Sequence, residues 1–277
     1  MMEPFPQLCF TLMAPYGAWG AASPSSATTA WKATELDPSK SAIVGLLGAA
    51  LGLERAHLGR LSEGLRVAVR TGLRPERDPR PDYHTIGRAN RPEGRTVWSR
   101  FEELRPALAG GGQAGALLSR REYWSCGLWS VALVSTDPAI PLERLEEALR
   151  APRWPLYAGR KACTLGLPPD PGTEAAAGPV AALTAYGWPW ERRPALADAL
   201  APLLWRKRDR ERLDGPETLS WDEGYPGITD GGTLRRVRRR DRPDPLPLPG
   251  GRVYPRFHER TELRAEFPAP APAGSGS

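Results

Sequence analysis

The stretch Gln7–Met13, QLCFTLM, places leucine or phenylalanine at every second position, at 8, 10 and 12. A period of two is typical of a β-strand, so we predict a first strand here. Outward from this strand, residues 14–38 form a long polar loop that carries Trp19 and Trp31. Its length is typical of a functional segment rather than a simple connection.

A buried helix is predicted next, because the apolar residues between Ser39 and Gly52 cover most of the helix circumference. Ser39 suits the N-cap and Gly52 suits the end. The free N–H groups at the helix start, together with Lys40, suit a phosphate oxygen, with plain N-capping as the alternative. A second strand follows at 65–70, and its arginines at 66 and 70 form a basic face that suits phosphates.

The next elements complete a recognisable order. Strands are expected at 117–123 and 127–135, then a helix at 141–150 with a leucine stripe, then a short strand at 156–158. Strand, helix, strand, strand, helix, strand predicts an α+β fold with a ferredoxin-like, RRM-like βαββαβ core. RNA-recognition modules use this arrangement.

Proline and glycine divide the rest of the chain. Residues 72–116 lose all periodicity and predict an extended protrusion. We expect three parts, namely a core with its protrusion at 1–168, a small and mostly β part packing on it at 169–265, and a disordered, linker-like tail at 266–277. Within the second part, the pattern predicts a helix at 194–205 and hairpin strands at 233–239 and 252–257.

The composition is globular and rich in chain-breakers, because 277 residues include 31 prolines and 29 glycines. No run of about 18 uncharged apolar residues occurs and the start lacks a signal-peptide pattern, so we expect a cytoplasmic protein that makes no membrane contact. Cys9, Cys126 and Cys163 lie far apart, which argues against a disulfide framework or a zinc module. We expect no metal and no cofactor.

Positive charge is concentrated in two zones of a chain whose formal net charge is +6. Residues 66–121 carry 12 basic and 6 acidic groups, and a second excess lies at 235–240. Thirty-four of the 38 basic residues are arginines, whose planar fork pairs with phosphate and stacks on bases. This favours a nucleic-acid partner, with genome base composition as the alternative source of the arginines.

No familiar enzyme motif is present: the segment around Lys40 lacks the glycines of a Walker A loop, and GxSxG and HExxH patterns are absent. Tyr83 and His84, between Arg80 and Arg88, are either an RNA-stacking patch or a metal-free ribonuclease pair.

Two further patterns are candidate RNA contacts. Gly159, before Arg160 and Lys161, lets the backbone approach a ligand that the two cations then meet. Around the next predicted strand, an RNA contact and an exposed strand face are equally open interpretations for Arg120, Arg121 and Tyr123. We interpret Trp188 and Trp190 as packing residues rather than base platforms.

Five segments, read in order, carry a resemblance to a known family: Ala14–Gly20, Pro38–Gly52, Asp82–Thr85, Ser119–Tyr123 and Leu156–Cys163. Together they resemble the CasD family of subunits of type I-E CRISPR Cascade, over roughly residues 7–168 and more weakly around 234–256. The resemblance implies a RAMP-type ferredoxin-like core with a β-hairpin thumb, at about 72–116.

The resemblance also implies a function in antiviral defence. Proteins of this family are non-catalytic subunits that grip the 5′ handle of the guide RNA (crRNA), and a separate endonuclease cuts the precursor. The implied neighbours are a backbone subunit of CasC type and a large subunit of CasA type, with target DNA nearby. The implied RNA-binding residues are Trp19, Ser39, Lys40, Ser41, Tyr83, His84, Thr85, Arg120, Arg121, Tyr123, Arg160 and Lys161.

The chain departs from the family pattern in its N-terminal loop. Gly17 stands where the family usually has Gln, and residues 21–31 lack the usual arginines. Two other functions stay open. One is a metal-free endoribonuclease that processes precursor crRNA, as in a type I-C-like relative, with Tyr83, His84 and Lys161 as candidates. The other is a single-strand RNA-binding protein that acts alone.

Overall fold

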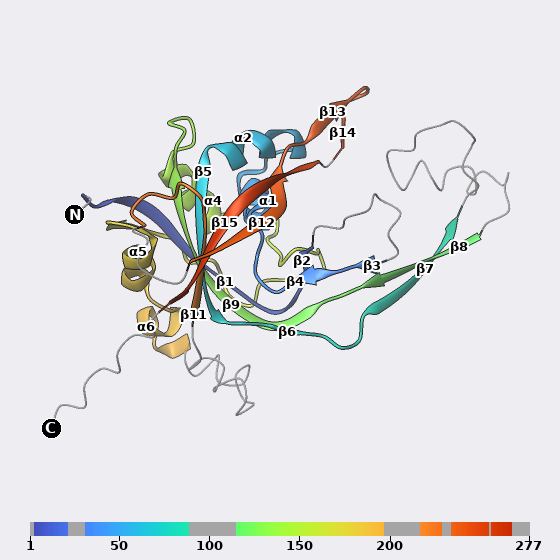
Figure 1. The fold of residues 1–277 in the computed structure, drawn as a ribbon, viewed down its shortest axis with the longest axis horizontal. Coiled ribbons are helices and arrows are strands. Elements are labelled where there is room, and N and C mark those ends of the chain that lie inside the picture. Colours follow the sequence, from blue (N-terminus) through green and yellow to red (C-terminus); the bar gives the residue numbers. More distant parts are fainter. Residues whose placement is uncertain are drawn as a thin grey trace.

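The computed structural model describes residues 3–21, 31–88, 115–196, 217–228, 234–254 and 256–267. One long, twisted sheet runs through them (Figure 1), and its neighbouring strands are antiparallel. Its strands lie in the order β10 (Gly172–Ala176), β1 (Phe5–Gly17), β9 (Trp124–Ser135), β5 (Leu65–Leu73), β11 (Glu217–Asp222), β15 (Phe257–Phe267) and β12 (Arg235–Pro243).

The first four strands of this order form the ferredoxin-like core that the sequence predicts. In chain order the core is β1, α1 (Lys40–Leu51), β5, β9, α4 (Leu142–Arg150) and β10, and its fourth strand pairs with the edge of its first. The predicted last strand at 156–158 is wrong, because only an isolated bridge from Tyr157 to Thr164 forms there. Prolines before and after this segment interrupt strand pairing, so β10 completes the core instead.

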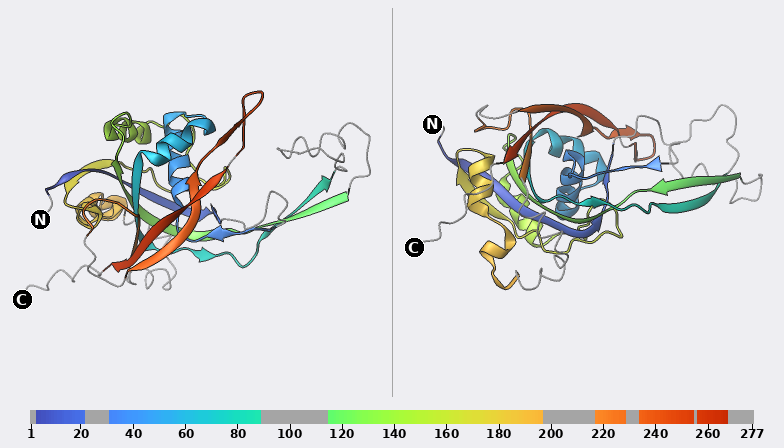
Figure 2. Two further views of the ribbon diagram at one scale, coloured as in Figure 1. Left: turned by 45° about the horizontal axis from the view of Figure 1, so that its top comes forward. Right: turned by 60° about the horizontal axis from the view of Figure 1, so that its bottom comes forward.

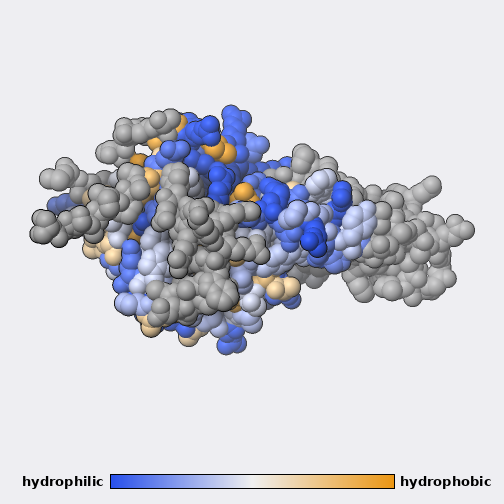
Figure 3. Space-filling model, turned by 90° about the horizontal axis from the view of Figure 1, so that it is seen from below, coloured by the Kyte–Doolittle hydropathy of each residue, from blue (hydrophilic) through white to orange (hydrophobic). Residues whose placement is uncertain are grey.

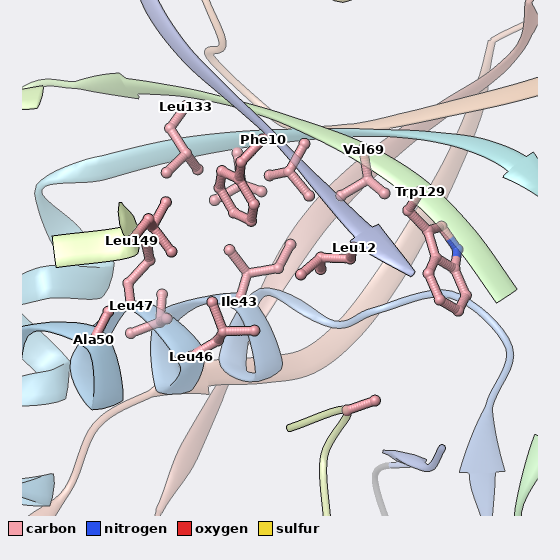
Figure 4. Packing of buried hydrophobic residues seen from close by; sticks show 14 of the residues in the cluster. Phe10, Leu12, Ile43, Leu46, Leu47, Ala50, Val69, Trp129, Leu133 and Leu149 are labelled. Carbon is pink, nitrogen blue, oxygen red and sulfur yellow. The ribbon is translucent and has the colours of Figure 1, made fainter. Parts of the chain in front are cut away.

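The core lies where α1 packs against one face of the sheet. Figure 4 shows Ile43, Leu46 and Leu47 of α1 pointing toward Phe10 and Leu133. Each fully buried side chain of this size stabilises the fold by about 1.5–3 kcal/mol relative to leaving it exposed. The predicted caps are confirmed, since the Ser39 side chain accepts a hydrogen bond from the Ala42 N–H and Gly52 is left-handed with φ 70°.

Two short helices cover the opposite face of the sheet (Figure 2). They are α5 (Pro179–Tyr186) and α6 (Pro189–Arg192), two helices that the sequence pattern did not indicate. Tyr186 packs with Ala68, Trp221 and Phe267 in a second apolar cluster. The sheet is therefore buried between two layers, which explains why β1 is buried on both faces.

The C-terminal part extends the same sheet rather than packing on it as a separate unit. The core ends at Ala176 rather than at 168, and β11 was not predicted. The two predicted hairpin strands correspond to β12 and to β14 (Arg252–Tyr254), which pairs with β13 (Leu246–Leu248). Glu266 and Phe267, predicted as the start of the tail, belong to β15. Most of the predicted helix at 194–205 and residues 268–277 lie outside the described residues.

A hairpin arm leaves the body and projects to one side, as Figure 1 shows. Its strands are β7 (Asp82–Arg88) and β8 (Gly115–Arg121), and β3 (Trp31–Lys32) pairs in parallel with β8. We call these paired strands the thumb root. They form a protrusion within the predicted segment 72–116, but residues up to Arg77 still pair with the body sheet through β5 and β6, and β8 continues to Arg121. Residues 89–114 lie outside the described part.

Smaller elements join the arm and α1 to the body: β2 (Trp19–Gly20), β4 (Thr34–Glu35), β6 (Glu76–Arg77), the 3-10 turn Arg55–His57 and α2 (Leu58–Glu63). Among the described residues, no helix is both long and apolar enough to cross a membrane. Figure 3 shows that the described surface seen from below is mostly hydrophilic, with small scattered apolar areas. Partners that bind on this side therefore meet a polar surface.

Candidate nucleic-acid interface

The start of α1, predicted to bind phosphate, is filled by protein groups. The Lys40 backbone N–H donates to Asp241 Oδ2 at 2.9 Å. The Lys40 ammonium is buried and donates to Asp222 at 2.6 Å and to the Leu65 carbonyl at 2.9 Å. Ser39 is buried, and its Oγ is hydrogen-bonded to Ser41 Oγ at 2.9 Å. Ser39 and Lys40 are therefore engaged within the fold in this structure, and Ser41, which is half-buried, bonds to Ser39.

A buried ionic cluster extends from Lys40 across the C-terminal strands. Arg260 is its centre and bonds to Asp222 at 2.8 Å, to Asp241 at 2.6 Å and to Glu262 at 2.7 Å. Burial raises the pKa of Asp241, but the hydrogen bond and the charge of Arg260 outweigh burial and hold that pKa below its ordinary value. The cluster fastens β11, β12 and β15 to α1.

The predicted basic face of β5 is likewise used internally. Arg70 is buried and forms a two-point ion pair with Glu217 of β11. Its guanidinium also lies 4.5 Å from the ring centroid of Trp188, which confirms Trp188 as a packing residue. Arg66 bonds to the backbone carbonyls of Glu63 and Leu65. Arg70 is therefore engaged within the fold, whereas Arg66 remains half-buried.

Trp19 and Tyr123, both predicted as RNA contacts, are buried. Trp19 packs against Trp124 and Trp129, with ring centroids 5.4 and 5.5 Å away. Tyr123 stacks on Tyr16 at 4.7 Å and carries the Arg160 guanidinium 4.2 Å from its ring centroid. Their rings are covered by the protein, so they support the thumb root rather than offer a surface for a base.

One row of side chains on the thumb root is open to solvent. Trp31 on β3, Arg120 on β8 and Tyr83 on β7 are direct cross-strand neighbours, and we call them the aromatic row. The Arg120 guanidinium lies 5.3 Å from the Trp31 ring centroid and 5.7 Å from that of Tyr83. Trp31 is 51% exposed and Tyr83 is 60% exposed. Exposed rings around an arginine are the chemistry that stacks on unpaired bases.

Glu122 holds the Trp31 side chain of the aromatic row in place by a hydrogen bond. Its Oε1 accepts from Trp31 Nε1 at 2.8 Å, its Oε2 accepts from the Thr34 N–H at 3.2 Å, and it forms an ion pair with Arg77. Burial raises the pKa of Glu122, but the hydrogen bonds from Thr34 and Trp31 and the charge of Arg77 together hold that pKa below its ordinary value. Glu122 is therefore a charged anchor for the Trp31 indole, a role that the sequence did not reveal.

Replacing Glu122 with alanine should weaken RNA binding by about 5- to 10-fold, the equivalent of one lost hydrogen bond of about 1–1.5 kcal/mol. The indole would lose the acceptor that fixes its orientation. Glu122→Gln keeps an oxygen for one donor and should lose less. Fluorescence anisotropy with labelled RNA measures the effect, with the exposed Glu143→Ala as control. Unchanged affinity of Glu122→Ala would show that Trp31 needs no brace.

The reverse face of the thumb root carries the other polar residues predicted to bind RNA. His84 lies opposite Ser119 and Asp82 opposite Arg121, and His84 Nε2 is 3.7 Å from the Asp82 carboxylate. Four shielded polar atoms here and on the neighbouring turn have no hydrogen-bond partner among the described residues: His84 Nε2, Ser119 Oγ, Arg121 Nε and Arg160 Nη1. Groups of this kind are usually completed by an ordered water molecule or by a ligand. Thr85 pairs with Leu118 along the backbone, and its side chain lies outside the described part.

The turn at Gly159 packs on protein rather than on a ligand. Gly159 has φ 82°, and a Cβ atom there would come within 1.9 Å of the Ala18 carbonyl oxygen. The Ala18 N–H donates to the Ala158 carbonyl at 3.1 Å, which docks the turn on the end of β1. The glycine is thus required by this close approach. Arg160 is half-buried beside Tyr123, and Lys161 remains exposed.

The structure therefore separates the predicted site residues into two groups. Those that stay at the thumb root or the adjacent turn are Tyr83, His84, Thr85, Arg120, Arg121, Arg160 and Lys161. Trp31 joins them although it was not predicted as a contact, because only the tertiary pairing of β3 with β8 places it beside Arg120. No cluster of three or more metal-ligating side chains occurs in the part of the chain that the structure describes.

A ferredoxin-like core with a projecting hairpin places the chain in a fold class that RNA-recognition modules share. A family model described as CRISPR-associated protein (Cas_Cas5) matches residues 7–243. The CRISPR system Cascade subunit CasD of Escherichia coli (strain K12) is 33% identical over 196 residues, which are 65% of this chain and 76% of that protein. The chain belongs to this family of CRISPR-associated proteins and is similar to the CasD subunit of type I-E Cascade.

A solved structure supports the fold. A chain of a "CRISPR RNA-guided surveillance complex" superposes with a TM-score of 0.52 and 20% identity, and the match covers 94% of this chain and 89% of that chain. The β-rich α+β architecture is thus that of a chain in such a complex.

Proposed function

We propose that this chain is the Cascade subunit that binds the 5′ handle of the crRNA and does not cut it. It acts as a cap on one end of the complex, bridging a backbone subunit of CasC type and a large subunit of CasA type during DNA interference. The aromatic row is the observation that carries the proposal. Exposed Trp31 and Tyr83 beside Arg120 supply two stacking faces and a cation on one side of a projecting hairpin.

The charge around the aromatic row supports the same role. Arg121 lies on the reverse face of the hairpin, and Arg160 and Lys161 lie on the turn that docks against the end of β1. Phosphates of an RNA strand that stacks on the aromatic row and continues around the hairpin and over the turn would meet these cations.

The geometry of the hairpin argues against a ribonuclease that uses Tyr83 and His84. Consecutive side chains of a strand point to opposite faces, and here Tyr83 faces Arg120 whereas His84 faces Ser119. A general acid and a general base must both reach one phosphodiester within about 3 Å. Tyr83 and His84 lie on different faces, so they do not form such a pair.

The purified chain should bind precursor repeat RNA without cutting it. The measurement is incubation with end-labelled repeat RNA in chelator, with the parent, His84→Ala and Tyr83→Phe side by side. A catalytic His84 would contribute about two to four orders of magnitude to the rate, so its loss would be obvious. Site-specific cutting by the parent and none by His84→Ala would replace this proposal with the endoribonuclease.

Copurification tests whether the chain acts as a subunit of a Cascade complex. Copurification after expression with the other Cascade subunits should yield a uniform short RNA together with backbone and large subunits. A monomer that binds any RNA and copurifies with no other subunit would support the protein that acts alone and contradict the proposal.

A further inference from the structure

A second basic surface lies on β12, on the side of the sheet away from α1. Side chains of a strand alternate between its faces, so Arg236, Arg238 and Arg240 share one face, and we call them the β12 arginine row. All three are exposed. The alternate residues are about 6.6–6.8 Å apart, close to the separation of successive phosphates along an extended nucleic-acid strand.

Arginines on the two faces of β12 differ in burial and in ion pairing. On the face toward α1, Arg239 is 9% exposed and lies 3.6 Å from Asp241 and 3.4 Å from Glu262. On the outer face, Arg236 pairs with Glu223 at 3.2 Å, but both side chains are more than half exposed, at 69% and 51%. Exposed pairs of this kind contribute little and exchange readily for another anion.

The cross-strand neighbours of Arg238 and Arg240 leave the β12 arginine row available to a ligand. Arg238 lies opposite Thr261, an uncharged residue, and Arg240 lies opposite the exposed Glu259. The Arg240 Nε–H donates to the Phe257 carbonyl at 3.2 Å, which orients the guanidinium of a side chain that is exposed. In the described residues β12 pairs only with β15, so an elongated ligand can lie along the outer edge of the sheet.

We propose that the β12 arginine row binds the phosphodiester backbone of a nucleic-acid strand, independently of base sequence and separately from the thumb root. Arginine suits this ligand because its planar fork bonds two phosphate oxygens at once. The ligand is defined by its phosphates, so RNA and DNA are both candidates and the test has an arm for each.

The test compares the full chain with Arg236→Gln/Arg238→Gln/Arg240→Gln. A control triple variant, Arg55→Gln/Arg144→Gln/Arg153→Gln, removes the same charge from exposed positions elsewhere. Anisotropy is measured with labelled 20-mers of uridylate RNA and thymidylate DNA between 50 and 200 mM salt. Losing three phosphate contacts should reduce the slope of log K against log salt by about 2 units and weaken low-salt binding by about 10-fold or more.

Each outcome decides the proposal. A smaller slope for the β12 variant but not for the control supports it, and the arm that changes identifies RNA, DNA or both as the ligand. Equal slopes for the β12 variant and the parent, or an equal loss in the control, would overturn it. Loss of a protein subunit from the complex without any change in nucleic-acid binding would also overturn it, in favour of an acidic protein surface.

The experiment is distinct from the test of the thumb root. Trp31→Ala/Tyr83→Ala leaves β12 intact, and its effect should add to that of the β12 variant. If the thumb variant binds like the parent while the β12 variant does not, the proposed handle site fails and the β12 site stands.

Discussion

Replacing Asp222 with alanine should lower the free energy of unfolding by about 3–5 kcal/mol, the usual cost of removing one member of a buried ion pair. The Asp222 carboxylate accepts from Lys40 at 2.6 Å, from Arg260 at 2.8 Å and from the Val67 N–H at 3.1 Å. Its loss leaves two buried cations without this partner and a strand N–H without an acceptor. Urea denaturation followed by circular dichroism measures the change.

The neighbouring residue provides a matched control. Glu223 is 51% exposed and pairs with Arg236, so Glu223→Ala should change stability by no more than about 0.5 kcal/mol. Asp222→Asn keeps an acceptor for Val67 and should fall between the two. Similar midpoints for Asp222→Ala and Glu223→Ala would mean that the ionic cluster does not fasten the C-terminal strands to α1.

The largest functional loss is expected from Trp31→Ala/Tyr83→Ala. Stacking on an aromatic side chain is worth about 1–3 kcal/mol per base, so losing two rings should weaken handle binding by ~2–4 kcal/mol, or about 30- to 1,000-fold. Both rings are more than half exposed, so the fold should be retained. Anisotropy with a labelled handle RNA measures the affinity, and thermal unfolding verifies the fold.

An exposed tryptophan elsewhere separates stacking at the thumb root from general loss of aromatic surface. Trp154 is 44% exposed, close to the 51% of Trp31. Trp154→Ala should bind the handle like the parent. Equal losses for Trp31→Ala and Trp154→Ala would show that the aromatic row has no special part in binding.

The core elements were predictable because their signals are local. The alternation at Gln7–Met13, the caps at Ser39 and Gly52 and the leucine stripe of α4 each depend on residues within a few positions of one another. Burial of Leu142, Leu145 and Leu149 confirms the stripe. Period and capping chemistry therefore determine these elements almost independently of the rest of the chain.

The C-terminal half was less predictable because its partners are remote in sequence. β11 is a strand because it pairs with β5 and β15, and no pattern in its six residues indicates which strands lie beside it. β10 replaces the predicted strand at 156–158 because it pairs with β1 along Gly172–Ala176, whereas only an isolated bridge from Tyr157 to Thr164 forms at the predicted strand.

Contacts between residues remote in sequence also determine which predicted residues belong to the candidate site. Lys40 follows an N-cap, and for this reason it was predicted to bind phosphate. In the structure its ammonium bonds to Asp222 and its backbone N–H bonds to Asp241, two carboxylates about 200 positions away in sequence. Trp31 was only part of a loop in the sequence, and the pairing of β3 with β8 made it part of the aromatic row. Tertiary contacts thus decide which polar groups bond within the protein and which remain available to a ligand.

The most direct test of the central claim is photocrosslinking in the assembled Cascade, with a guide RNA that carries 4-thiouridine in its 5′ handle. Mass spectrometry then identifies the crosslinked residues. We expect crosslinks to Trp31 or Tyr83, or to peptides of β3, β7 and β8, and we expect Trp31→Ala/Tyr83→Ala to abolish them. Handle crosslinks confined to other parts of this chain or to other subunits, in a complex that contains this chain, would contradict the assignment of the thumb root as the handle site.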